Sequence, residues 1–593
     1  MRKLALSDEI LLTVEKPARY IGGEYGERDL VWNKFNYCIC FPDVYEVGMS
    51  NLGIRIVEES LMQVDGVTVD RAFTPWEDFG NALRENKIPL YSLGLKKPLK
   101  DFDMLGFSLQ FELSYTEVLR MLDLANIPLL SCERDESYPI IQGGGPCAFN
   151  PEPIADFFDL FVIGDGEEVM QEIAKLKLKY DSKAEFLQAV STLDGVYVPS
   201  LMQVNYGDNR LISGFSGKTR VKKAVCRDLD SAVFPNSMTV GNIEAVFDRA
   251  VIEVMRGCPR GCRFCQAGFL YRPIRFRSVE TLKKQAISLI ENTGFDELSL
   301  NSLSTGDYPC LLELLKELKK SLPKTQIALP SLRVDSFSEE FTTQSRKSSL
   351  TFAPEAGTQR LRDVINKDVT EDEIERCILR AIETGITSIK LYFMMGLPTE
   401  TDEDLDGIVN VVYKIRELYS KNRKMSKSLR ISVSCSTFIP KPFTPFQWER
   451  QITKDEFEQK IARLKEKLFV KGVNFSWNNF EVSELEAVLA RGDRKLSKVI
   501  LSAYRSGAHL DAWSEFFKPE IWDSALKEHG LSASDYTREH KTDEILAWDF
   551  VDNIVTKDYL LKEKEKAYSR TVTGSCFNGC KGCGLQKEYR CKL

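Results

Sequence analysis

Residues 254–266 read Val-Met-Arg-Gly-Cys-Pro-Arg-Gly-Cys-Arg-Phe-Cys-Gln, so Cys258, Cys262 and Cys265 form a C-x3-C-x2-C cluster. The cluster follows the apolar segment 250–255, for which we predict a strand. Soft thiolates favour iron–sulfur clusters, zinc or copper over hard cations. Three thiolates leave one corner of a four-iron cluster without a protein ligand. The spacing therefore predicts a metal site with a position open for chemistry.

The same spacing occurs again at Cys576, Cys580 and Cys583, and Cys591 follows them. With 15 Cys in 593 residues, chance gives about 0.01 such clusters per chain, so two are not accidental. Four thiolates can complete either an auxiliary iron–sulfur cluster or a zinc site. We predict a metal site in this tail and favour the auxiliary cluster, with zinc as the first alternative and a dithiol relay or an end without metal as the second.

The composition is that of a globular protein, with 43% hydrophobic and 28% charged residues. No apolar stretch approaches the roughly 20 residues of a membrane span, and the first residues lack a signal-peptide pattern. We therefore expect a cytoplasmic protein without a membrane partner. The formal net charge of −7 gives no global attraction to nucleic acid, so an RNA substrate would need local basic patches.

The first third of the chain alternates apolar runs with helical periodicity. The predicted strands are 35–41, 67–73, 102–109, 138–142 and 158–163, and the predicted helices are 51–63, 115–125 and 167–178. This order predicts an α/β fold with a doubly wound parallel sheet, whose ligands lie beyond the carboxyl ends of the strands. The Gly-rich turns 143–146 and 164–167 would let a ligand approach the backbone.

From residue 246 the alternation restarts with longer helices. The predicted strands are 250–255, 297–300, 326–329, 350–353, 388–394 and 430–434, and the predicted helices are 279–292, 309–322, 338–347, 370–384, 402–419 and 455–468. Six such units predict a partial (β/α)6 barrel with the cysteine loop at the face where barrel enzymes place their chemistry. Beyond residue 470 we predict a helical region, with helices at 483–491, 495–506, 511–516 and 559–568.

These patterns divide the chain into four predicted parts. They are an amino-terminal sheet domain (1–225), the partial barrel (245–470), a helical region (471–568) and the Cys-rich tail (569–593).

With this barrel and this cysteine loop, the chain resembles the radical S-adenosylmethionine (radical SAM) superfamily, and Phe264 before the last cysteine also fits. The resemblance implies that the loop holds a four-iron four-sulfur (4Fe-4S) cluster whose open iron binds S-adenosylmethionine (SAM). It further implies reductive cleavage of SAM to a 5′-deoxyadenosyl radical that removes a hydrogen from the substrate. An electron donor such as flavodoxin or ferredoxin is implied as a partner, and the cofactors carry the hard chemistry.

The resemblance also implies cofactor contacts outside the loop. Ser302, Ser304 and Asp307 follow the second strand, where many relatives have a Gly-Gly-Glu motif, although a helix cap explains these residues equally well. Glu355 lies in a segment similar to the one that contacts ribose and methionine in relatives. Gly396 begins a Gly-Leu-Pro-Thr-Glu-Thr run typical of relatives that pack this loop on the adenine.

Outside the barrel, segments 14–24, 41–50 and 143–153 are similar to a bacterial radical SAM family with a cobalamin-binding-like amino-terminal domain and a Cys-rich tail. Histidine cannot ligate cobalt in that domain here, because His509, His529 and His540 all lie outside it. Cobalamin binding without a protein ligand stays open. Asn51 and Phe443 stand where that family often has histidine.

The sequence thus predicts a radical SAM enzyme that acts on a substrate it does not identify: RNA, protein or a small metabolite. Transfer of a methyl or methylthio group is one expected outcome, and a cobalamin-dependent radical SAM methyltransferase is the alternative. A non-catalytic iron–sulfur electron carrier is the alternative from another class. It would need four ligands at each site, and the loop shows no obvious fourth cysteine.

Overall fold

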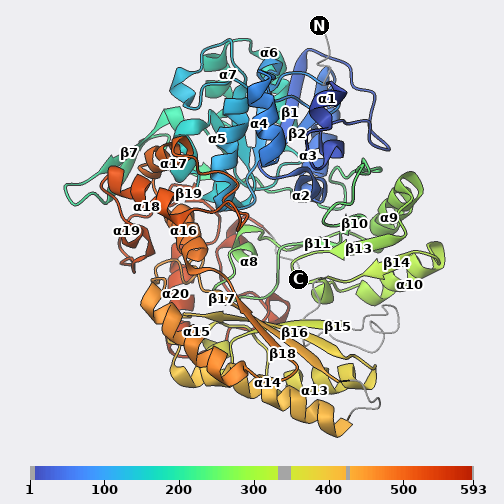
Figure 1. Ribbon diagram of the computed structural model, residues 1–593, viewed down its shortest axis with the longest axis vertical. Coiled ribbons are helices and arrows are strands. Elements are labelled where there is room, and N and C mark those ends of the chain that lie inside the picture. The colour runs from blue at the N-terminus through green and yellow to red at the C-terminus, as the bar shows by residue number, and fades with distance from the viewer. Residues whose placement is uncertain (1–6, 331–348, 423–427, 590–593) are drawn as a thin grey trace.

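The computed structural model describes residues 7–330, 349–422 and 428–589 (Figure 1). Its amino-terminal part is a six-stranded sheet in the order β2-β1-β3-β4-β5-β6. The strands are β1 (Phe35–Phe41), β2 (Val67–Phe73), β3 (Met104–Ser108), β4 (Ile140–Gly144), β5 (Leu160–Val162) and β6 (Val196–Tyr197). Only β6 runs antiparallel to its neighbour. β1 and β2 are buried at every residue because other elements cover both faces of the sheet, so the predicted parallel α/β fold is confirmed.

The longer helices of this part follow the strands in the alternation expected of a doubly wound sheet. They are α3 (Leu52–Met62), α4 (Glu77–Glu85), α5 (Tyr115–Leu124), α6 (Val169–Lys179) and α7 (Lys183–Val190). Asn51 starts α3, because its side chain accepts a hydrogen bond from the backbone N–H of Ile54. The strand order 2-1-3-4-5 creates a switch point between β1 and β3, where such folds bind their ligands.

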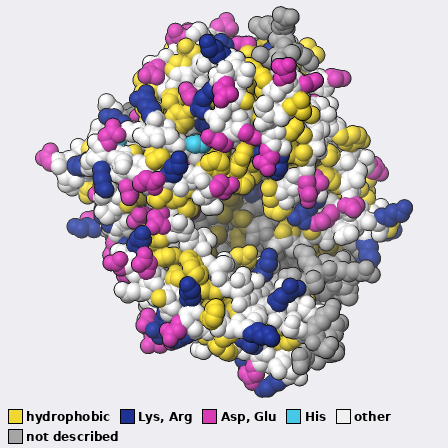
Figure 2. Space-filling model, in the orientation of Figure 1, with side chains coloured by type: hydrophobic (Ala, Val, Ile, Leu, Met, Phe, Trp, Pro, Cys, Tyr) yellow, Lys and Arg dark blue, Asp and Glu magenta, His cyan; other side chains and the backbone are white. Residues whose placement is uncertain are grey.

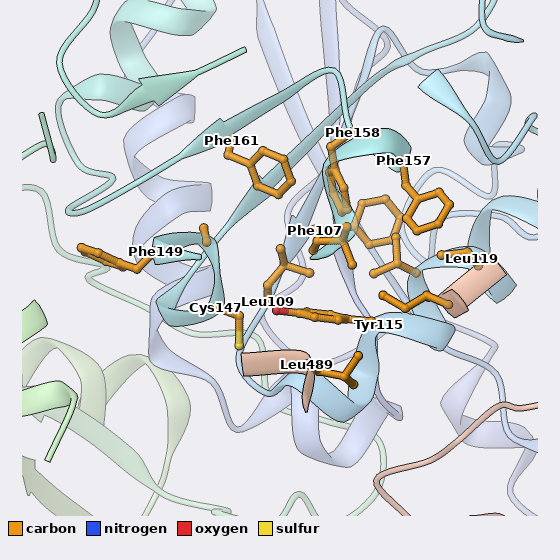
Figure 3. Packing of buried hydrophobic residues seen from close by; sticks show 14 of the residues in the cluster. Phe107, Leu109, Tyr115, Leu119, Cys147, Phe149, Phe157, Phe158, Phe161 and Leu489 are labelled. Atoms are coloured by element: carbon orange, nitrogen blue, oxygen red, sulfur yellow. The ribbon is translucent and has the colours of Figure 1, made fainter. Parts of the chain in front are cut away.

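The core of the amino-terminal sheet is shared with the carboxyl-terminal helices. Phe158 packs edge-on against Phe107 and lies 4.7 Å from Phe161, measured between ring centroids. Figure 3 shows that Leu489, from a helix late in the chain, lies beside Tyr115 of the amino-terminal part. The apolar surface of each part is therefore buried against the other.

The barrel consists of two groups of parallel strands. The first group contains β10 (Ala250–Glu253), β13 (Glu297–Asn301) and β14 (Gln326–Ala328). The second group contains β15 (Ser349–Glu355), β16 (Ser388–Met395), β17 (Arg430–Thr437) and β18 (Val473–Trp477). The short strands β11 (Met255–Arg256) and β12 (Arg275–Phe276) form an antiparallel pair on either side of the cysteine loop.

The helices of the barrel are α8 (Ala267–Leu270), α9 (Val279–Thr293), α10 (Leu311–Ser321), α12 (Gln359–Val364), α13 (Glu371–Glu383), α14 (Asp402–Asn422) and α15 (Lys454–Leu468). Several of them begin at a residue whose side chain caps the helix. Thr370 and Thr453 form reciprocal capping boxes with a Glu three residues later, which explains the sharp starts of α13 and α15.

The carboxyl-terminal region contains α16 (Phe480–Arg491), α17 (Leu496–Arg505), α18 (Pro519–Glu528), α19 (Ser534–Thr537) and α20 (Lys557–Tyr568). In Figure 1 these orange and red helices lie beside the amino-terminal sheet and along the barrel. Two predictions are wrong here. Residues 511–516 form turns, not a helix, and the segment after residue 470 adds a seventh barrel strand, β18, before it becomes helical. The predicted helix 338–347 lies outside the described residues.

Within the described ranges, none of the helices is both long and apolar enough to cross a bilayer.

Asp165 joins the amino-terminal sheet to the barrel through two arginines. Its carboxylate pairs with Arg275 and lies 3.0 Å from Arg256. Burial alone would raise the pKa of Asp165, but Arg275 and Arg256 lower it to about 2. Since the folded pKa lies below the ordinary value of 3.8, the pair stabilises the fold above about pH 4, and this contribution is lost as the pH falls toward 2.

We expect Asp165→Asn to remove about 2 kcal/mol of stability at neutral pH and to flatten the acid dependence of the melting temperature between pH 4 and 2. Asp181→Asn, at an exposed position, is the matched control. Melting temperatures of the three proteins across this pH range check the prediction, and an unchanged acid slope in the Asp165 variant would contradict it.

Candidate functional site

The cysteine loop lies between β11 and α8, at the carboxyl end of the first barrel strand. The thiol of Cys262 interacts electrostatically with those of Cys258 and Cys265. Burial, and then the neighbouring Cys262 thiol, raises the pKa of Cys258 to about 12 and that of Cys265 to about 11. These thiols are therefore protonated at neutral pH without a metal, and metal binding must displace their protons.

Among the residues that the structure describes, no three His, Cys, Asp or Glu side chains converge closely enough to hold a metal ion. The thiolates that hold a four-iron cluster bind different iron atoms, so they lie farther apart than the ligands of a single metal ion. Three neighbouring thiols on one loop fit that wider arrangement. The donor set is thus compatible with an iron–sulfur cluster.

Glu355 lies beside this loop, and its predicted contact with a cofactor stays a prediction. It ends β15 with a φ of 68°, in the left-handed region that residues other than glycine rarely adopt. Its Oε1 is 3.0 Å from Nζ of Lys367, and that Nζ lies 5.9 Å from the ring centre of Phe264. Both Glu355 and Lys367 interact electrostatically with Cys265. Lys367 was missed from the sequence, since nothing in its local pattern marks it.

Asp307 lies beside the loop as well, but its carboxylate is engaged. Arg260, between the first two cysteines, donates to both of its oxygens at 2.7 and 3.0 Å. Ser304 donates to the same carboxylate at 2.6 Å, and Ser302 bonds to Thr305 at 3.0 Å. The structure therefore gives Ser304 and Asp307 a role in fixing the cysteine loop.

Gly396 is needed for the conformation of the backbone at this point. Its φ of 79° favours glycine, and a Cβ there would meet Ile452 at 2.7 Å. Its N–H donates to the Glu400 carboxylate at 3.0 Å. The amide is thus satisfied within the protein, and a contact of Gly396 with a cofactor stays a prediction.

The Cys-rich tail is docked on the cysteine loop, which the sequence did not reveal. The N–H of Cys576 donates to the carbonyl of Pro259 at 2.9 Å. Asn366 donates to the carbonyls of both Gly261 and Thr573 at 3.0 Å, and so bridges loop and tail. Phe577 stacks on Phe276 of β12 at 6.4 Å between ring centroids. Cys580 and Cys583 follow in the same turn-rich segment, whereas Cys591 lies outside the described residues.

A buried ion pair fastens the tail from the other side. Arg263, between the second and third cysteines, is fully buried and donates twice to Glu563 of α20, at 3.1 and 3.2 Å. It also donates to the carbonyl of Thr571 at 2.7 Å, and the Thr573 hydroxyl donates to Glu563. Loop, helix and tail are therefore one hydrogen-bonded unit.

A cavity of about 560 Å³ lies between the amino-terminal sheet and the barrel. Its wall includes Ser108 and Gly144 at the carboxyl ends of β3 and β4, Gln142 within β4, and Gly257 next to the first cysteine of the loop. Gln142 is 4% exposed, and its Oε1 has no hydrogen-bond partner among the described residues. Figure 2 shows a hollow with hydrophobic side chains near the centre of the molecule. The cavity is large enough for a small-molecule ligand and reaches the loop.

The two positions that depart from the family pattern are both structural here. Asn51 caps α3 and also lines the cavity. Phe443 is 6% exposed and packs edge-on against Phe149. Neither side chain supplies the ionisable group that a histidine would.

Comparison with known proteins identifies both main parts of the chain. The family described as "Radical SAM proteins, N-terminal" matches residues 53–199, and the radical SAM superfamily matches residues 252–412. An uncharacterised protein of Methanocaldococcus jannaschii is 28% identical over 83% of this chain and 98% of its own length.

More distant similarities extend to named enzymes. The ribosomal protein uS12 methylthiotransferase RimO of Thermoanaerobacter is 24% identical over 42% of this chain, and the match spans 62% of that enzyme. The structure of the radical SAM methyltransferase TsrM from Kitasatospora setae, with cobalamin and a 4Fe-4S cluster bound, covers 69% of this chain and 76% of its own at 13% identity and a TM-score of 0.45. The family matches to both the amino-terminal part and the barrel show that this chain belongs to the radical SAM superfamily.

Proposed function

We propose that this protein is a radical SAM enzyme whose 4Fe-4S cluster is held by Cys258, Cys262 and Cys265. The observation that carries the proposal is the placement of three electrostatically interacting thiols on one loop at the carboxyl end of a barrel strand, in a chain of this superfamily. When bound, the cluster supplies the electron that cleaves SAM to methionine and a 5′-deoxyadenosyl radical, which takes a hydrogen from the substrate.

The charged residues around the cysteine loop also support this proposal. Glu355 and Lys367 place an ion pair beside Cys265, where the charged amino and carboxylate groups of a methionine moiety would need partners. Arg260 and Asp307 fix the backbone between Cys258 and Cys262. The tail contacts the loop at Pro259 and, through Asn366, at Gly261.

The deciding experiment uses anaerobically reconstituted full-length protein. With dithionite and SAM, we expect formation of 5′-deoxyadenosine and a change in the electron paramagnetic resonance (EPR) spectrum of the reduced cluster when SAM is added. An intact cluster that yields no 5′-deoxyadenosine and ignores SAM would favour a non-catalytic electron carrier. Labelled SAM incubated with fractionated extract would then show whether label moves to RNA, protein or a metabolite. We propose methyl or methylthio transfer as the reaction class.

Glu355→Ala should raise the SAM concentration for half-maximal 5′-deoxyadenosine formation by about 10- to 100-fold, because the methionine moiety loses a polar contact and the ion pair of Glu355 with Lys367 is lost. The cluster content should not change. Glu383→Ala, an exposed carboxylate on α13, is the control. A Glu355 variant with unchanged SAM dependence would remove this residue from the proposed site.

Cobalamin-dependent methyl transfer is the second candidate, and the cavity favours it. The cavity lies at the β1/β3 switch point, presents the unpartnered Gln142 Oε1 and adjoins the cysteine loop. The wall from the amino-terminal sheet contains no histidine, so any corrinoid bound there would lack an imidazole ligand from this wall.

Gly144→Leu tests this candidate. Gly144 lines the cavity, and a Cβ there would meet only the Val162 carbonyl at 3.8 Å, so the larger side chain would fill the cavity without a backbone clash. If cobalamin binds, we expect at least about a 10-fold weaker affinity for hydroxocobalamin in the variant, measured by visible absorption. Gly214→Leu, on an open surface strand, is the control. Equal binding by both variants, or none by the unmodified protein, would count against this candidate.

A further inference from the structure

The carboxyl-terminal tail surrounds a buried positive charge that the proposed SAM site does not use. Arg272 is 4% exposed, and its guanidinium lies 5.0 Å from the ring centre of Phe269 and 5.8 Å from that of Tyr559. Two of its nitrogens donate to the carbonyls of Gly268 and Arg260. Its Nη1 has no hydrogen-bond partner in the part of the chain that the structure describes.

No carboxylate neutralises this charge among the interactions described. The ionisable groups that act on Arg272 are the Tyr559 phenol and the thiols of Cys583 and Cys576. A buried cation without a counter-ion is strongly unfavourable, so native proteins pair such groups. A phenol and two thiols are neutral at neutral pH in their ordinary state and cannot fill that role. Thiolates bound to a metal can.

The three tail thiols lie together. Cys576 interacts electrostatically with Cys583 and with Cys580, and also with Arg272. Cys583 is 9% exposed, and its carbonyl accepts from the N–H of Thr556 at the start of α20. Cys580 is exposed and accepts a weak hydrogen bond from the N–H of Gly582. The group thus contains one exposed thiol and two that face the buried cation.

We propose that Cys576, Cys580 and Cys583 hold a second iron–sulfur cluster, and that buried Arg272 is the counter-ion of its thiolates. The tail thiols repeat the spacing of the cysteine loop, for which an iron–sulfur cluster is proposed. This repeat favours an iron–sulfur cluster over zinc in the tail as well.

The second cluster lies beside the cysteine loop. The Cys576 N–H bonds to Pro259, next to Cys258, and Arg272 donates to the carbonyl of Arg260 in the same loop. Arg272 therefore contacts the backbone of one cysteine group and interacts electrostatically with thiols of the other. The site is separate from the proposed SAM site, so the two proposals can fail independently.

Metal counting on the full-length protein tests the assignment. After anaerobic reconstitution with iron and sulfide, iron, sulfide and zinc are measured per chain in the unmodified protein and in three variants. The tail variant carries C576S, C580S and C583S, the loop variant carries C258S, C262S and C265S, and C310S is the control at an exposed cysteine. We expect the unmodified protein and the control to contain about twice the iron of either triple variant.

Three results would overturn the proposal: a tail variant with the full iron content, a loop variant without iron, or a loop variant that takes up zinc in place of iron and sulfide. The loop variant keeps the test valid even where the tail variant fails to fold. Failure of the SAM reaction in the unmodified protein would leave these metal counts unchanged, so it tells against the proposed function alone.

The counter-ion is tested separately, in the loop variant, where only the tail cluster remains. We expect Arg272→Gln to lower the midpoint potential of that cluster, because the more reduced and more negative state loses a nearby positive charge, while Arg272→Lys keeps the potential closer to that of the parent. EPR-monitored redox titration gives this readout, which a purely structural role of Arg272 would not move. Equal potentials in the Gln variant and its parent would overturn the assignment of Arg272.

Discussion

Replacing Cys262 by alanine is expected to reduce 5′-deoxyadenosine formation by at least about a thousandfold, to the background of the reaction without protein. Cys262 is one of the three proposed ligands, so its loss leaves two, which cannot hold a four-iron cluster. Mutation of a residue that only hydrogen-bonds to a metal ligand typically lowers metal affinity or activity by about 10- to 100-fold. Loss of the ligand itself should lower them further. Product is measured by chromatography under dithionite and SAM.

The matched control for this variant is Cys310→Ala, which changes an exposed cysteine outside both groups and should keep full activity. Circular dichroism and the melting temperature of the Cys262 variant separate loss of the cluster from loss of the fold. A Cys262 variant that retains a tenth or more of the activity would mean that the loop does not hold the reactive cluster.

Replacing Glu563 by alanine is expected to produce the largest loss of stability, about 3–5 kcal/mol. Arg263 and Glu563 are 0% and 1% exposed, and removal of the carboxylate leaves a buried guanidinium without its charge partner. Thr573 loses the acceptor of its hydroxyl in the same step. Because Arg263 lies between Cys262 and Cys265, the variant should also retain less iron after reconstitution.

Glu565→Ala is the control, since it removes an exposed carboxylate two positions along α20. Thermal melting compares the two variants, and limited proteolysis shows whether the tail has come loose. A Glu563 variant as stable as the Glu565 variant would show that Arg263 is adequately satisfied by the carbonyls of Asp363, Val364 and Thr571 alone.

Much of the fold could be predicted because its strands are buried on both faces. The predicted limits of β1 and β2 agree with the structure to the residue, since helices on both faces require continuous apolar runs. The strand β18 was missed because it lies at the end of its sheet and is partly or fully exposed at every position, so no apolar run marks it. Residues 511–516 carry helical spacing but form turns before Pro519 starts α18.

Only those residues of the candidate site that belong to a short sequence pattern could be predicted. The cysteine spacing and Glu355 at a strand end are readable in the sequence, and the structure brings them together. Lys367, Asn366 and the docking of the tail depend on contacts between segments distant in the chain, for which no local pattern exists. The four-part division of the chain and the identity of the cofactor ligands stay predictions.

The docking of the tail on the cysteine loop has a consequence for biosynthesis. Residues 571–577, which bond to or stack on the loop and its flanks, are translated long after residues 258–265. Since chains fold from the amino terminus during synthesis, the nascent loop stays uncovered until this segment has left the ribosome. If the loop holds the proposed cluster, iron would reach it most easily before residues 571–577 dock on it.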